Sequence, residues 1–109
     1  MEDNNILYIK LSNINEMITL FRVLSDNFNT ITIKFNKSFG MSIIEIDKLT
    51  NVIIKVKIPL TSFIEYYIDI DELAVNINVK SFLESLEEYN DVEILTLFVD
   101  RDDTNEINF

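Results

Sequence analysis

The chain contains no cysteine and no histidine, and it has only one glycine and one proline. Without cysteine, neither a disulfide framework nor a thiolate zinc site can form. Without histidine, the commonest general base and metal ligand is missing. No long apolar run follows the acidic residues 1–3, so we expect no signal peptide, no transmembrane helix and a soluble intracellular protein.

Hydrophobic residues are abundant despite a strongly acidic balance. The 109 residues are 48% hydrophobic, and 9 basic residues stand against 19 acidic ones, for a formal net charge of −10. This length and this hydrophobic content predict a single domain over residues 1–109 with a core of its own. The net charge argues against a protein that wraps nucleic acid with its whole surface, although a local basic patch is compatible with it.

Residues 30–59 predict an antiparallel meander of three strands. Apolar and polar residues alternate over 31–35, which is the period-2 pattern of a strand with one buried face. Gly40 lies in the following turn and predicts a backbone position with positive φ. The second strand covers 41–46 and is largely apolar on both faces. The third covers 52–58 with one apolar face, and the chain's only proline ends it.

Two amphipathic helices and further strands surround this meander. One helix begins at Ile14, and the other follows Asn78, a residue type that caps helices. The expected strands outside the meander cover residues 6–11, 63–70, 92–99 and 105–109, with 73–77 as either an extension of the second or a separate short strand.

The order of these elements predicts an internal repeat, a β-α-β-β-β unit whose second copy lacks its last strand. The apolar stripe of the first helix recurs in the second at a constant offset of 65 residues, from Ile14 onto Val79. The strand after each helix matches at an offset of 63 residues, from Phe35 onto Phe98. The sequence therefore predicts an α+β fold in which two helices pack on antiparallel sheets.

Three segments, in this order and spacing, resemble the DNA sliding clamps of the proliferating cell nuclear antigen (PCNA) family. Residues 40–47 (GMSIIEID) followed by Val52 are similar to that family's glycine, hydrophobic pair, Met-Asp and valine run. Residues 73–83 resemble its GVNL…SKIL segment without the glycine, and residues 91–97 resemble its EDIITLR segment. The resemblance implies a DNA-clamp-like fold with its last strand missing, equivalent to the first half of a two-domain clamp subunit.

The resemblance also implies a function. Clamps of this family are non-catalytic processivity factors that close into a ring around double-stranded DNA and tether polymerase or other replication proteins through short peptide motifs. We expect weak, non-specific DNA contact by this domain alone, a ring oligomer only together with the missing C-terminal part, and no membrane contact.

The cellular setting and the alternative function follow from composition. The Asn- and Ile-rich composition suits an AT-rich genome, for example a viral one, so we expect the nucleus or a viral replication compartment. The alternative is a clamp-fold adaptor for protein interaction or transcription that does not encircle DNA. The acidic helix faces favour that alternative.

The resemblance places functional residues on two surfaces. Arg22, Lys80 and Asn15 lie on the expected exposed sides of the helices, where the family faces DNA phosphates. Ordinary solvated helix faces are the competing interpretation. The second surface is a partner-peptide pocket in the meander, where an apolar dimple beside a sheet edge takes an aromatic or aliphatic anchor, and plain core positions are the competing interpretation. Its residues are Ile46, Asp47, Leu49, Thr50, Val52 and Ile54.

Two clusters of carboxylates, within residues 69–72 and 100–106, are expected to be charged turns. Neither has the glycine of a calcium loop, so we expect no metal site and no cofactor. No histidine or nucleophile accompanies them, so we also expect no enzymatic activity.

Overall fold

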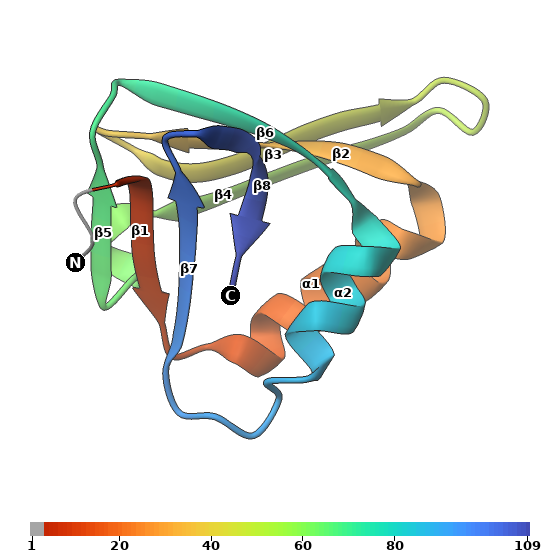
Figure 1. Cartoon of the computed structure of the whole chain (residues 1–109). Coiled ribbons are helices and arrows are strands. Elements are labelled where there is room, and N and C mark those ends of the chain that lie inside the picture. Colours follow the sequence, from red (N-terminus) through yellow and green to blue (C-terminus); the bar gives the residue numbers. More distant parts are fainter. Residues whose placement is uncertain (1–3) are drawn as a thin grey trace.

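The computed structural model describes residues 4–109, so the expectation that rests on residues 1–3 lies outside the described part of the chain. Two antiparallel four-stranded sheets and two helices make up this part (Figure 1). Sheet A contains, in spatial order, β5 (Glu65–Ile68), β1 (Asn5–Leu11), β7 (Leu95–Asp100) and β8 (Asp103–Asn108). Sheet B contains β4 (Val52–Pro59), β3 (Gly40–Asp47), β2 (Thr30–Asn36) and β6 (Glu72–Asn78).

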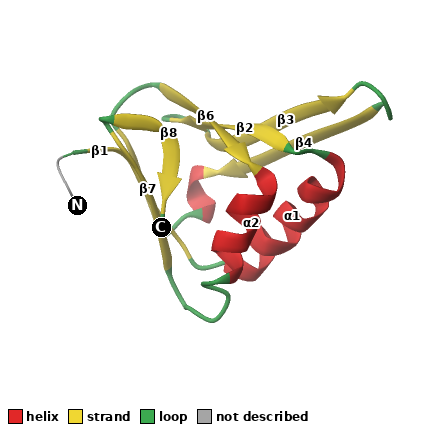
Figure 2. Cartoon of the chain, turned by 45° about the vertical axis from the view of Figure 1, so that its right-hand side comes forward, coloured by secondary structure: helices red, strands yellow, loops and turns green. Residues whose placement is uncertain are grey.

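The two helices, α1 (Ile14–Asn27) and α2 (Val79–Glu87), lie side by side in the angle between the two sheets (Figures 1 and 2). The predicted helix stripes are confirmed, because apolar residues three and four positions apart face the core on both helices. The rings of Phe21 and Phe82 meet between the helices with their centroids 4.8 Å apart. Asn78 caps α2 as predicted, since its side-chain oxygen accepts from the Ser81 backbone N–H at 3.0 Å. The predicted arrangement of helices packed on antiparallel sheets is therefore confirmed.

Sheet pairing shows how the internal repeat is built. β1 pairs with β7 and β2 pairs with β6, both antiparallel, so each half of the repeat contributes to both sheets. The equivalent elements are β1 and β6, α1 and α2, β2 and β7, and β3 and β8. Residues 73–77 belong to the separate strand β6, the counterpart of β1, whereas β5 is an additional strand at the edge of sheet A. Within residues 4–109, β4 has no counterpart.

The predicted match of Phe35 onto Phe98 is wrong by one residue. Phe35 is buried in β2, and its register partner across the sheet is Leu73 of β6. The equivalent buried position in β7 is Val99, which pairs with Leu7 of β1, whereas Phe98 is half-buried on the opposite face. Side chains alternate between the two faces of a strand, so a slip of one residue exchanges a buried position for an outer one.

Two strands are shorter than predicted. The strand expected over 63–70 is limited to β5, and a 3₁₀ turn (Leu60–Ser62) precedes it. The strand expected over 92–99 begins only at Leu95, because residues 88–94 form the loop that leads from α2 into β7. Val92 and Ile94 are consequently exposed rather than part of the ladder.

Tyr66 joins the two sheets through one hydrogen bond. Its hydroxyl group donates to the backbone carbonyl oxygen of Asn36 in β2 at 2.9 Å. Burial raises the pKa of Tyr66 to about 12. Between pH 10 and 12 the native protein keeps this proton while the unfolded chain loses it, so stability falls as the pH rises through this window.

Replacing Tyr66 with phenylalanine tests this contact. Tyr66→Phe is expected to lower the free energy of unfolding by about 1 kcal/mol at neutral pH, because it leaves the Asn36 carbonyl oxygen without its donor. Urea unfolding between about pH 7 and 12 should show the two proteins converging above about pH 10. Tyr8→Phe, on the outer face of β1, is the control and should keep the wild-type pH dependence. A constant difference between wild type and Tyr66→Phe over this whole range would contradict the assignment.

Candidate functional site: the β3–β4 hairpin and the helix face

The β3–β4 hairpin projects beyond the rest of the molecule, past the end of α1 (Figure 1). The six residues predicted to form a peptide pocket all lie at the tip of this hairpin. Asp47 and Val52 are the last paired residues of the ladder, and Leu49 and Thr50 lie in the exposed turn between them. Leu49 is 97% exposed. The structure thus brings the predicted residues together on a projecting element.

These residues are divided between the two faces of the hairpin. Ile46 pairs directly with Ile53 on the outer face, where they are 57% and 60% exposed. Val52 and Ile54 point to the opposite face, where Ile54 packs against the core. A ligand on one face therefore cannot contact all six predicted residues.

Sequence reasoning missed two residues of the outer face. Ile53 lies opposite Ile46, and Ile44 lies two residues before Ile46 on the same face of β3, 53% exposed. The sequence feature that indicates this surface is the apolar character of both faces in the second strand of the meander. A core-facing strand needs only one apolar face, so the second apolar face marks a surface that can receive a partner.

The helix face holds the three residues predicted to meet DNA, and all three are exposed: Asn15 and Arg22 on α1 and Lys80 on α2. However, Arg22 Nη2 lies 3.0 Å from Glu87 Oε2 of α2 in an ion pair across the two helices. Arg22 and Glu87 occupy equivalent positions of the repeat, 65 residues apart. The positive charge of the Arg22 guanidinium is therefore already neutralised by a carboxylate of the same chain.

Carboxylates outnumber cations over the rest of the helix face. Glu16, Asp26, Glu84 and Glu88 are located on the helices or at their ends, and all four are exposed. Phosphates would meet these carboxylates beside Lys80, so electrostatic attraction between this surface and DNA is small.

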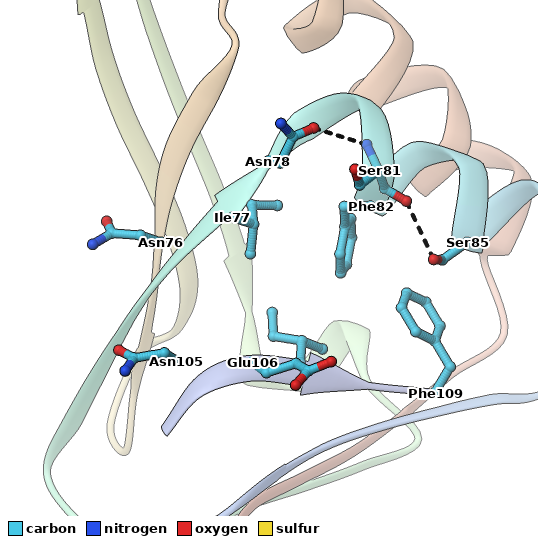
Figure 3. Close-up of a pocket in the computed structure, with 10 residues that line it drawn as sticks. Asn76, Ile77, Asn78, Ser81, Phe82, Ser85, Asn105, Glu106 and Phe109 are labelled. Carbon is cyan, nitrogen blue, oxygen red and sulfur yellow. Dashed lines mark hydrogen bonds between the residues drawn. The ribbon is translucent and has the colours of Figure 1, made fainter. Parts of the chain in front are cut away.

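A hollow of about 230 Å³ lies between β6, α2 and β8 in the second half of the repeat (Figure 3). The rings of Phe82 and Phe109 meet in its wall with centroids 5.3 Å apart, and Ser85 lines it from α2. In the first half, Met17 and Leu20 of α1 are the equivalent residues, and they line a second hollow of about 260 Å³ together with Val56 and Ile58 of β4. A counterpart of β4 beside β8 would add the same wall to the hollow of the second half.

The two carboxylate clusters are turns only in part. Residues 69–71 and 101–102 form bends and turns as expected, whereas Asp100 ends β7 and Asp103 and Glu106 belong to β8. Arg101 pairs with Asp69, which joins the β7–β8 turn to the end of β5, and this guanidinium lowers the pKa of the Asp69 carboxyl. Among residues 4–109, no three acidic side chains are placed so that they could hold a metal ion. Neither α1 nor α2, which are the helices of the described chain, has the length and apolarity needed to cross a membrane.

Comparison with known proteins shows a likeness in fold. No protein-family model matches the chain, and no curated protein matches it in sequence. A chain of the PCNA2–PCNA3 complex from Sulfolobus tokodaii is similar over 92% of this chain, with a TM-score of 0.75 and 24% identity. The PCNA from Thermococcus kodakaraensis is similar over 94%, with a TM-score of 0.74 and 19% identity. The predicted α+β, clamp-like fold is therefore confirmed.

The chain spans only 39% and 44% of the length of these two clamp chains. The prediction that it corresponds to the first half of a two-domain subunit stays a prediction.

Proposed function

We propose that this chain is a sliding-clamp domain, a non-catalytic scaffold that helps to tether polymerase and other replication or repair proteins to double-stranded DNA. The observation that carries the proposal is the clamp-like fold over more than nine-tenths of the chain. The internal repeat supports it, because it sets two helices side by side on one surface, the arrangement that could line a ring.

The two functional surfaces would play different roles. The helix face would meet the phosphates weakly and without sequence preference, through Lys80 at the start of α2 and Asn15 at the opposite end of the helix pair, which suits a protein that slides. The tip of the β3–β4 hairpin would receive the anchor side chains of a partner peptide on Ile46 and Ile53. Closure around DNA would need a further strand at the edge of β8, where the hollow beside Phe109 is open.

A second function is favoured by one specific observation. The Arg22–Glu87 ion pair and the surrounding carboxylates give the helix face an excess of negative charge. A clamp-fold adaptor that binds proteins but does not encircle DNA never brings this face near phosphates, so its negative charge causes no repulsion.

Retention on circular DNA separates these two functions. The full gene product is mixed with nicked circular duplex and with a labelled peptide that carries aromatic and aliphatic anchors, and the mixture is passed through a gel-filtration column. A clamp should elute with the circle, carry the peptide with it, and be released when a restriction enzyme opens the circle, because the link to DNA is topological.

Two controls make this experiment specific. Ile46→Ser combined with Ile53→Ser should release the peptide while the protein stays on the circle, because both side chains are exposed and their loss spares the core. Ile64 precedes β5 and is 55% exposed, so the Ile64→Ser protein should still bind the peptide and stay on the circle. A protein that binds the peptide but elutes apart from the circle would identify the adaptor. Equal retention on linear and circular DNA would contradict encirclement.

A further inference from the structure

Charge is distributed very unevenly along the chain. Residues 30–59, from β2 to the end of β4, contain five lysines and two carboxylates, whereas the remaining residues contain four basic and seventeen acidic residues. The meander thus carries a net charge of +3 and the rest of the chain −13. The most basic part of the chain is therefore the meander, which forms three of the four strands of sheet B.

Three of these lysines share the outer face of sheet B. Lys34 of β2 and Lys57 of β4 are both register partners of Ser42 in β3, and Lys55 pairs with Ile44. The lysines are exposed, and no carboxylate among residues 4–109 lies within ion-pair distance of them. Their positive charges are consequently available to another molecule.

Exposed isoleucines continue this surface toward the hairpin tip. Ile44, Ile46 and Ile53 are each more than half exposed. At the other end, Phe39 is 78% exposed and borders a groove of about 520 Å³. Lys34, Lys57 and one carboxylate, Glu72 of β6, also line this groove. We define the lysine–isoleucine face as Lys34, Lys55, Lys57, Ile44, Ile46 and Ile53.

The complementary chemistry is present on the same chain. The α2–β7 loop, residues 88–94, carries the carboxylates Glu88, Asp91 and Glu93, and none of them forms an ion pair within residues 4–109. Between them lie Val92, 39% exposed, and Ile94, 53% exposed. The loop and the hairpin tip are at opposite sides of the molecule in both views (Figures 1 and 2), so one molecule cannot cover its own face.

We propose that the lysine–isoleucine face receives the α2–β7 loop of a second copy of this chain. The loop would place its carboxylates beside the lysines and its aliphatic side chains on the isoleucines. A second copy and the partner peptide of the proposed function would therefore compete for Ile46 and Ile53. Nucleic acid is the poorer occupant, because a phosphate placed against the isoleucines would lose water without gaining a hydrogen bond, and the face contains no arginine for bidentate phosphate binding. The association is head-to-tail and uses sheet and loop surfaces rather than strand edges.

The net charge sets the salt dependence of this contact. Two copies that each carry −10 repel one another at long range, and this repulsion fades beyond about 10 Å at about 0.1 M salt. Close pairs between lysines and carboxylates are screened less than the long-range repulsion. Association should therefore be strongest near about 0.1 M salt, weaker at about 0.01 M because repulsion dominates, and weaker at about 1 M because the contact pairs are screened.

Sedimentation velocity of the 109-residue chain tests the proposal directly. Wild type should associate with rising concentration at about 0.1 M salt. Lys55→Glu with Lys57→Glu should weaken the association at least about tenfold, because like charges then meet at the contact. Asp91→Lys with Glu93→Lys should weaken it to a similar extent. An equimolar mixture of the two variants should associate again, because one variant supplies the reversed face and the other the reversed loop.

The control adds negative charge elsewhere. Asn29→Glu with Thr61→Glu changes two exposed residues that belong to neither surface, and this variant should associate as wild type does. A wild type that is still monomeric at about 1 mM would overturn the proposal. If the wild type and all variants associate to the same sedimenting mass, the proposal is also overturned, and the association is assigned to strand edges. If Lys55→Glu with Lys57→Glu loses binding to duplex DNA but keeps the wild-type sedimenting mass, the face is assigned to phosphates instead. None of these outcomes depends on retention on circular DNA.

Discussion

Gly40→Ala lowers the free energy of unfolding by at least about 3 kcal/mol and loosens the β3–β4 hairpin. Gly40 has φ +113°, a conformation that residues with a Cβ atom rarely adopt. A Cβ atom here would lie 2.3 Å from the Ile58 carbonyl oxygen and 2.9 Å from the Leu60 nitrogen. Both are backbone atoms at the end of β4, so no side chain can move aside. Urea unfolding followed by circular dichroism measures the loss.

Asn51→Gly is the matched control for this substitution. Asn51 is the other described residue with positive φ, at 57°, and it lies in the turn at the far end of the same hairpin. Glycine adopts this conformation without strain, so the variant should keep wild-type stability within about 1 kcal/mol. A Gly40→Ala protein that unfolds at the same urea concentration as Asn51→Gly would show that the hairpin accommodates the Cβ atom.

The helices could be predicted closely because their signal is local and long. Five buried residues of α1, from Ile14 to Leu24, recur over three turns at helical spacing, a pattern that a strand with its period of two cannot produce. The positive φ of Gly40 was predictable for a related reason, because the turn between two strand-like runs is where the chain most often needs a residue without a Cβ atom.

The register of the repeat could not be read from the chain alone. Phe35 and Phe98 are the same residue type, and identity of type favoured their match, whereas sheet pairing makes Val99 the equivalent residue. Strand positions one residue apart differ only in the face they occupy, and that face depends on which strands pair. β5 illustrates the same limit, because only its pairing with β1 shows that it lies outside the repeat.

The six residues predicted to form the peptide pocket lie together at the hairpin tip, but the sequence did not show which of them face outward. Ile46 and Ile54 have the same side chain, yet Ile46 faces outward and Ile54 packs against the core. The difference arises from the register of the β3–β4 ladder, which pairs Ile46 with Ile53. The Arg22–Glu87 pair was also hidden, because it joins residues 65 positions apart on two helices that meet only in the fold.

Phe21→Ala has the second large expected effect, a loss of about 3–5 kcal/mol in the free energy of unfolding. Phe21 is fully buried, and its ring meets that of Phe82 in the interface between α1 and α2. Its truncation removes the apolar contact and leaves a cavity between the helices that the two sheets cannot fill. Because these helices form the candidate DNA surface, their separation would also displace Lys80 from Arg22.

Thermal and urea unfolding measure this loss, and Phe39→Ala is the control. Phe39 carries the same ring in the β2–β3 turn but is 78% exposed, so its truncation should cost less than about 0.5 kcal/mol. Phe82→Ala alone and together with Phe21→Ala completes a double-mutant cycle for the ring pair. If the interface acts as one unit, the double variant loses less than the two single variants added together, because the first truncation already removes the partner ring. Strict additivity would mean that each ring is held by its own sheet, and that the two halves of the repeat are joined by strand pairing rather than by their helices.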